Sequence, residues 1–125
     1  MTLALFLVVA VAGGLGAGTR FVLDGVVRST VRTAFPWPTT LINLSGSLAL
    51  GVLTGLVVAR LAPTDVAAVI GTGFLGGYTT FSTASYETVQ LVRQKRYGTA
   101  FAYSFGVLVA CVALAFAGYR WGSSL

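Results

Sequence analysis

The feature that most constrains this chain is a set of four long stretches without a single charged residue. The stretches cover residues 3–19, 39–59, 66–86 and 97–119. Only 9% of the residues are charged, whereas soluble domains carry about 25%. Because about 20 apolar residues cross a bilayer core, the sequence predicts an all-α integral membrane protein with four transmembrane helices. We expect these helices over roughly residues 3–30, 38–60, 65–92 and 97–120.

The connecting segments are too short to hold a soluble domain, so residues 1–125 are predicted to form one transmembrane domain. Five basic residues lie in the first and third connectors, namely Arg28, Arg32, Arg93, Lys95 and Arg96. Two lie on the opposite side, Arg60 and Arg120. The positive-inside rule then places the first and third connectors in the cytoplasm. The net charge of +5 therefore indicates topology in a multi-pass plasma-membrane protein surrounded by lipid, and not a nucleic-acid-binding surface.

Residues 71–83 suit a membrane-spanning helix badly. They contain four glycines, followed by the four hydroxyl residues Thr79, Thr80, Ser82 and Thr83. One interpretation is a kinked helix whose hydroxyls bond to its own carbonyls. We favour a functional break in the third helix, because a doubled glycine beside a hydroxyl cluster weakens a helix more than a kink requires. A break frees carbonyls for a cation, and amides or hydroxyls for an anion.

Glycines also recur at the four-residue spacing that lets membrane helices approach closely. The pairs are Gly14 and Gly18, Gly51 and Gly55, and Gly73 and Gly77. We expect the first two pairs to serve helix packing alone. A bundle of four short helices has little interior, so the sequence also predicts at least a dimer.

Several side chains could line an ion pathway, and each has a plainer alternative. Thr40, Asn43 and Ser47 share one helical face; for Asn43, an interhelical hydrogen bond and a functional role are equally plausible. Phe81 could simply pack in the bundle, or it could present its electropositive ring edge to a small anion. Tyr103 is a polar residue of the last helix.

Two charged residues near the helix ends are equally ambiguous. Glu87 is the one acidic residue near the depth of a spanning segment, and an acid there is a functional hypothesis by default. Its plainer role is an ion pair with Arg93 or with an arginine of a partner chain. Arg20 could be a vestibule cation or an interfacial residue whose charge reaches water.

At this point the motifs resemble those of a known family, the Fluc (CrcB) fluoride channels, along essentially the full length of the chain. The matching motifs are Gly13-Gly14-Leu15-Gly16-Ala17 with Arg20, the segment Thr40-Leu41-Ile42-Asn43-Leu44-Ser45-Gly46-Ser47, and Gly73–Thr83 with Glu87. The last motif is highly specific. The resemblance implies four-helix subunits that pair antiparallel in a dual-topology dimer and let fluoride leave the cytoplasm passively.

The resemblance also implies roles for individual residues. A structural sodium ion at the dimer centre would be held by the backbone carbonyls of Gly76 and Thr79. The fluoride-lining residues would be Phe81, Asn43, Ser82, Thr83, Tyr103 and Thr40, with Arg20 near a pore entrance. These donors suit fluoride, whose tightly held water must be replaced by strong hydrogen-bond donors in a narrow pore.

Two positions depart from the family pattern. Ala84 stands where the family has a second phenylalanine, and Val107 stands where it has a hydroxyl. Antiparallel homodimers also need a chain that inserts both ways, and five basic residues against two, a moderate bias, is more than such a chain should have. We therefore hypothesise a heterodimer with a homologous subunit that supplies the missing ring, while a homodimer stays open because Tyr78 or Tyr86 could replace that ring.

Other classes of function fit the residues less well. An enzyme is not expected, because the chain has no His, no nucleophile–base pair and no metal-binding cluster. A proton-coupled small multidrug exporter is the main alternative. That class relies on an acidic residue in its first helix, and residues 3–19 contain none. A non-transporting membrane subunit is a further alternative.

Overall fold

The chain forms an all-helical bundle in a computed structural model that describes all residues, Met1–Leu125. Two long helices come first, α1 (Leu3–Thr30) and α2 (Trp37–Val58). A discontinuous segment follows, made of α3 (Thr64–Ala67), the π-helical η1 (Ala68–Leu75), α4 (Gly76–Tyr78) and α5 (Ser82–Arg93). The last helix runs without interruption through α6 (Tyr97–Phe101), the π-helical η2 (Ala102–Gly106) and α7 (Val107–Ser123).

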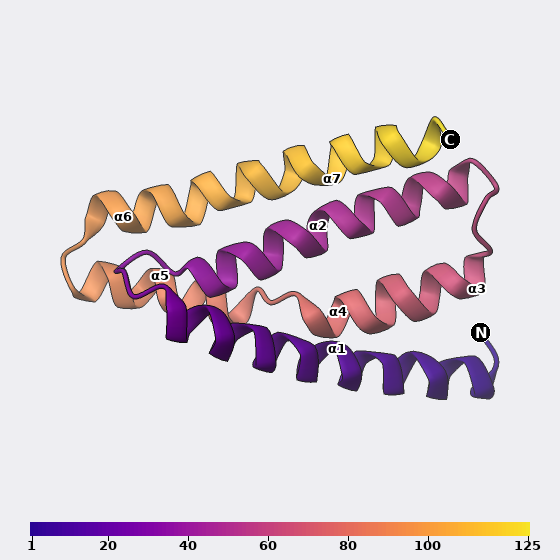
Figure 1. Cartoon of the computed structure of the whole chain (residues 1–125), viewed down its shortest axis with the longest axis horizontal. Coiled ribbons are helices and arrows are strands. Elements are labelled where there is room, and N and C mark those ends of the chain that lie inside the picture. The colour runs from indigo at the N-terminus through magenta and orange to yellow at the C-terminus, as the bar shows by residue number, and fades with distance from the viewer.

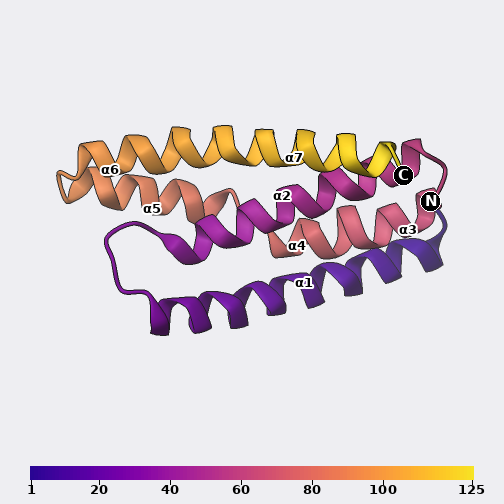
Figure 2. The same cartoon turned by 45° about the horizontal axis from the view of Figure 1, so that its top comes forward.

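Three of these helices are long and apolar enough to cross a membrane: Leu3–Thr30, Trp37–Val58 and Tyr97–Ser123. The predicted break in the remaining segment is present between α4 and α5, where Thr79 adopts an extended conformation. Figures 1 and 2 show α3, α4 and α5 following one another along the bundle; η1 and α4 lie against α1, whereas α5 packs against the last helix at α6 and η2. The chain thus passes along the bundle four times, and both termini lie at the same end.

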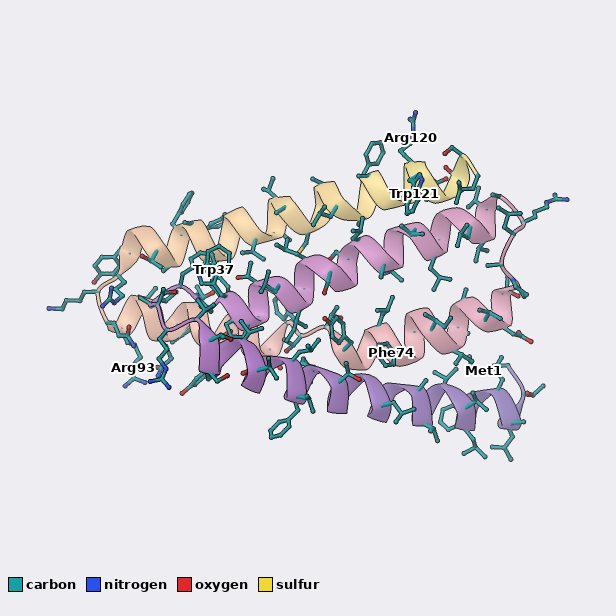
Figure 3. The ribbon with its side chains drawn as sticks, viewed as in Figure 1. Met1, Trp37, Phe74, Arg93, Arg120 and Trp121 are labelled. Carbon is teal, nitrogen blue, oxygen red and sulfur yellow. The ribbon has the colours of Figure 1, made fainter.

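The apolar side chains face outward, as expected of a protein whose solvent is lipid. Only 18 of the 125 residues are buried, while large apolar residues such as Phe6, Val11 and Phe21 are exposed on α1. A chain with this surface belongs in a membrane, which confirms the prediction of a multi-pass membrane protein. Figure 3 shows Trp37 and Arg93 toward one end of the bundle, and Arg120 and Trp121 toward the other.

Glycines set the helix packing, though not at all of the predicted positions. On α2, a Cβ added at Gly51 or Gly55 would collide with the α7 backbone, so this pair packs as predicted. The prediction for Gly14 and Gly18 was wrong, because both have open space around them. The residues of α1 that approach α4 are Gly13 and Gly16 instead.

Candidate functional site

The break in the discontinuous segment is held by the side chain of Asn43 on α2. Its Nδ2 donates to the Thr80 carbonyl over 2.8 Å, and its Oδ1 accepts from the Thr80 N–H over 2.9 Å. The amide therefore satisfies both backbone groups of one residue, as a neighbouring β-strand would. Since backbone groups at membrane depth must find partners inside the protein, this pairing explains why Thr80 can leave the helix.

The same rearrangement removes the helical partners of two carbonyls. In a continuous helix the Thr80 N–H would donate to the Gly76 carbonyl, but it donates to Asn43. The Thr83 N–H would donate to the Thr79 carbonyl, but it donates to the Thr80 hydroxyl over 3.1 Å. The carbonyls of Gly76 and Thr79 are the two predicted sodium ligands, and carbonyl oxygens are the ligand type that a hard cation prefers. This donor set fits the predicted ion.

Further contacts hold α4, on the N-terminal side of the break, against both α1 and α2. Arg20 on α1 donates from Nε to the Gly77 carbonyl over 3.3 Å, so its cation lies at the carboxyl end of α4. The Tyr78 hydroxyl lies 2.9 Å from the Ser45 hydroxyl on α2. The close approach of Gly77 to the backbone of Gly13 seats α4 against α1.

Beside the break lies a groove of about 670 Å³ between the discontinuous segment, α2 and the last helix. Five predicted site residues line it, namely Asn43, Gly76, Thr79, Phe81 and Tyr103. Phe81 is 87% exposed, so its ring has no cover within the chain. Ala84, the position of the missing ring, also lines the groove. The groove thus combines an amide, hydroxyls and an aromatic ring without any charged side chain.

The other predicted site residues lie outside this groove. Thr40 is buried and donates to the Pro36 carbonyl over 2.8 Å at the start of its own helix. Ser82 and Thr83 lie in the first turn of α5, and Arg20 lies on the far side of the break. Sequence reasoning missed two other hydroxyls of the groove, Ser85 and Thr88. Each donates to the carbonyl four residues earlier, a pattern that a polar residue in a helix does not reveal by itself.

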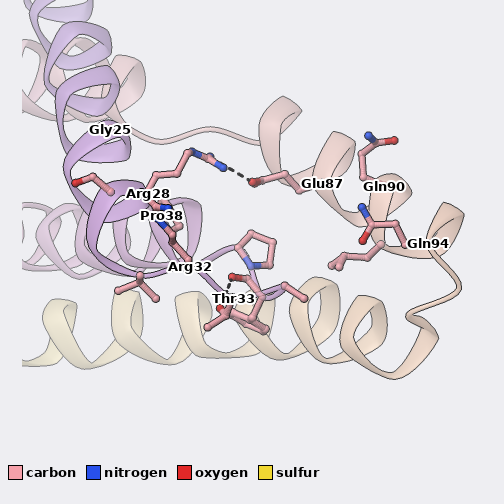
Figure 4. A pocket seen from close by; sticks show the side chains of 14 residues that line it. Gly25, Arg28, Arg32, Thr33, Pro38, Glu87, Gln90 and Gln94 are labelled. Carbon is pink, nitrogen blue, oxygen red and sulfur yellow. Dashed lines mark hydrogen bonds and ion pairs between the residues drawn. The ribbon is translucent and has the colours of Figure 1, made fainter.

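A second cavity, of about 740 Å³, opens at the end of the bundle where α1 meets α5; we call it the vestibule. Figure 4 shows its charged and polar residues, Arg28, Arg32, Glu87, Gln90 and Gln94. Nη2 of Arg28 lies 3.9 Å from Oε2 of Glu87. The suggested pairing of Glu87 with Arg93 was therefore wrong, because α1 brings Arg28 to the carboxylate.

Glu87 also connects the vestibule to the groove. Its Oε1 accepts a hydrogen bond from the Tyr103 hydroxyl over 3.1 Å, and Tyr103 lines the groove. Thr39 lies in the same region of α2, fully buried, and its hydroxyl has no hydrogen-bond partner. The sequence drew attention to Thr40, but the buried unpaired hydroxyl is that of its neighbour.

Known proteins that are similar to this chain agree on one family. A family model described as "CrcB-like protein, Camphor Resistance (CrcB)" matches residues 7–119. The "Fluoride-specific ion channel FluC 1" of Leifsonia xyli subsp. xyli is 51% identical over 108 residues, which are 86% of this chain and 79% of the relative. A "Fluoride-specific ion channel FluC" of Thermus thermophilus is 38% identical over 120 residues, 96% of each chain. The "Fluoride-specific ion channel FluC 2" of Moorella thermoacetica is 40% identical over 120 residues, covering 96% of this chain and 98% of the relative. This chain belongs to the CrcB family.

Proposed function

We propose that this chain forms a passive, fluoride-selective channel that lets fluoride leave the cytoplasm through the plasma membrane. The observation that carries the proposal is the groove at the break, which presents the second N–H of the Asn43 amide, the Ser47 hydroxyl and the exposed ring of Phe81 but no charged side chain. Such a surface can replace the water of a small anion without binding it so tightly that it cannot leave. The names of the relatives support fluoride as that anion.

In the same proposal, the broken segment is the third of four membrane-spanning segments, and a second subunit packs antiparallel over the groove. The exposure of Phe81 and the open groove favour such a cover, since a pore needs a wall on every side. A sodium ion would bind the carbonyls of Gly76 and Thr79, which have lost their helical partners. Membership of the CrcB family does not favour the multidrug exporter, and no enzymatic activity is proposed.

The second subunit is either another copy of this chain or a homologous subunit. Ala84 lines the groove with a methyl group where the family has a ring, which leaves room for a side chain from a partner. The excess of basic residues in the first and third connectors favours insertion in one direction. Both observations favour a heterodimer whose partner inserts in the opposite direction.

The test is fluoride efflux from liposomes, measured with a fluoride electrode, for this chain alone and then with a homologous subunit. We expect Phe81→Ile to lower efflux at least about tenfold, a loss of ~1.4 kcal/mol in the ring's interaction with the passing anion. Phe21→Ile is the matched control, because Phe21 is 81% exposed on α1, away from the groove. Fluoride efflux from the Phe81→Ile variant equal to that of the wild type would contradict the proposed pore. Robust fluoride efflux by this chain alone would contradict the heterodimer but would still support the proposed channel function.

A further inference from the structure

We propose that Asp24 and Arg28 on α1 act as a positioning pair for Glu87, holding its carboxylate against the Tyr103 hydroxyl where the vestibule meets the groove. Within this pair, the guanidinium of Arg28 would also partly offset the negative charge of Glu87, so that an anion can pass it. This inference rests on the proposed channel function. It assigns a role to two α1 residues that no sequence motif singled out.

The contacts form a continuous series from α1 to the last helix. Nε and Nη2 of Arg28 lie 3.0 and 3.4 Å from the two carboxylate oxygens of Asp24, one helical turn earlier. Nη2 also lies 3.9 Å from Oε2 of Glu87. The other carboxylate oxygen of Glu87 accepts from the Tyr103 hydroxyl. Each oxygen of Glu87 therefore has a different partner, and Asp24 fixes the guanidinium in two places.

The side chains of Glu87, Arg28 and Asp24 differ in their exposure to solvent, and this difference indicates what each one does. The Glu87 side chain is only 15% exposed, so its charge is partly withdrawn from water and needs a compensating partner. The Arg28 side chain is 61% exposed and that of Asp24 is 27% exposed. Arg28 is therefore not needed to fill the protein interior, and its replacement should change the environment of Glu87 without unfolding the bundle.

The contacts from Asp24 to Tyr103 lie where the vestibule meets the groove, so they can affect the passage of an ion between the two cavities. Arg28 and Glu87 line the vestibule, Tyr103 lines the groove, and the hydrogen bond between Tyr103 and Glu87 lies between the two cavities. Glu87 is the one acidic residue that lines either cavity. An anion that passes from the groove to the vestibule meets this carboxylate, and Arg28 is the cation closest to it.

The other groups around Glu87 do not take over this role. Arg32 lines the vestibule but makes no ion pair. Gln90 and Gln94 on α5 are neutral. The Tyr103 hydroxyl donates a hydrogen bond to the carboxylate but carries no positive charge. The structure thus assigns the compensation of Glu87 to Arg28 alone, with Asp24 holding Arg28 in place.

The experiment compares Arg28→Gln with Arg32→Gln, each in the assembly that conducts and each with and without Glu87→Gln. We expect Arg28→Gln to lower fluoride efflux about two- to fivefold, the range of a partly exposed ion pair. The loss should shrink in the double variant with Glu87→Gln, because the charge that Arg28 compensates is then absent. Arg32→Gln removes the same charge from the vestibule, so its effect should be the same factor whether or not Glu87 is replaced.

A second measurement, the melting temperature in detergent, does not depend on transport. Arg28→Gln should melt lower than the wild type, and Arg28→Lys should recover part of the difference. The inference is overturned if Arg28→Gln and Arg32→Gln behave alike, or if Glu87→Gln does not relieve the Arg28 variant. Absence of fluoride efflux from the wild-type assembly would overturn the proposed function, while the melting temperatures would still test the pair.

Discussion

The α2–α7 interface and the break between α4 and α5 both bring backbones close together through glycine, but they are stabilised in different ways. Between α2 and α7, Gly51 and Gly55 face the α7 backbone, while Gly118 and Gly122 face the α2 backbone. Both helices are continuous there, and no side-chain hydrogen bond joins them. At the break, Gly77 approaches α1 in the same way. There, however, the backbone leaves the helix and side chains replace the lost hydrogen bonds.

The difference shows what glycine spacing can and cannot specify in a membrane protein. Small residues permit close contact, and a continuous helix needs nothing more, because its backbone groups are already paired. A broken helix needs a second element with matching donors and acceptors. Asn43 on α2 supplies both to Thr80, and Arg20 on α1 supplies a donor to Gly77. The break is therefore a property of three helices together, while the α2–α7 interface is a property of two glycine patterns.

The largest effect is expected from Asn43→Leu, which tests whether the break depends on its side-chain partner. The substitution leaves the Thr80 N–H and carbonyl without partners, at about 1–3 kcal/mol for each buried group. We expect a large fall in melting temperature in detergent and loss of fluoride efflux. The matched control is Thr54→Ala, three turns further along α2, because Thr54 donates to the Leu50 carbonyl of its own helix and does not line the groove. If the Asn43→Leu variant has the melting temperature of the wild type, the stability of the break does not depend on the Asn43 side chain.

A smaller effect is expected from Gly118→Val, which tests the α2–α7 interface by steric means alone. The new side chain would meet the Leu48 carbonyl and the Val52 N–H, and backbone atoms cannot move aside as flexible side chains can. Overpacking of this kind costs about 1–3 kcal/mol. Gly106→Val in the same continuous helix is the control, because nothing lies within 4 Å of a Cβ at that position. Equal melting temperatures for the two variants would contradict the close packing of α2 and α7.

The sequence was a good guide to features that lie within one segment. Charge-free length predicted the helices, and the run of glycine and hydroxyl residues predicted the break at Thr79–Phe81. Contacts between segments were harder, because they depend on how each helix is rotated about its axis. A change of one residue turns a helical position by about 100°. For this reason Gly13 faces α4 while Gly14 does not.

Long-range partners were beyond the sequence for a related reason. An interhelical hydrogen bond was one of the two roles expected for Asn43, but the sequence did not identify its partner, Thr80, which is 37 residues away. Arg93 was the natural partner for Glu87 by sequence distance, yet the fold brings Arg28 to it. The roles of all the predicted fluoride-lining residues remain predictions, as do the sodium ligands Gly76 and Thr79.

The smallest effect is expected at Tyr78, which combines close packing with a hydrogen bond between side chains. Its ring is buried against Ile42 and Leu75, while its hydroxyl meets Ser45 on α2. Tyr78→Phe keeps the packing and removes only the polar contact, so the loss should be about 0.6 kcal/mol, the average for such bonds in membrane bundles. Ser45→Ala should cost the same, and the double variant should cost no more than either one. Additive losses in melting temperature would mean that the two hydroxyls act independently.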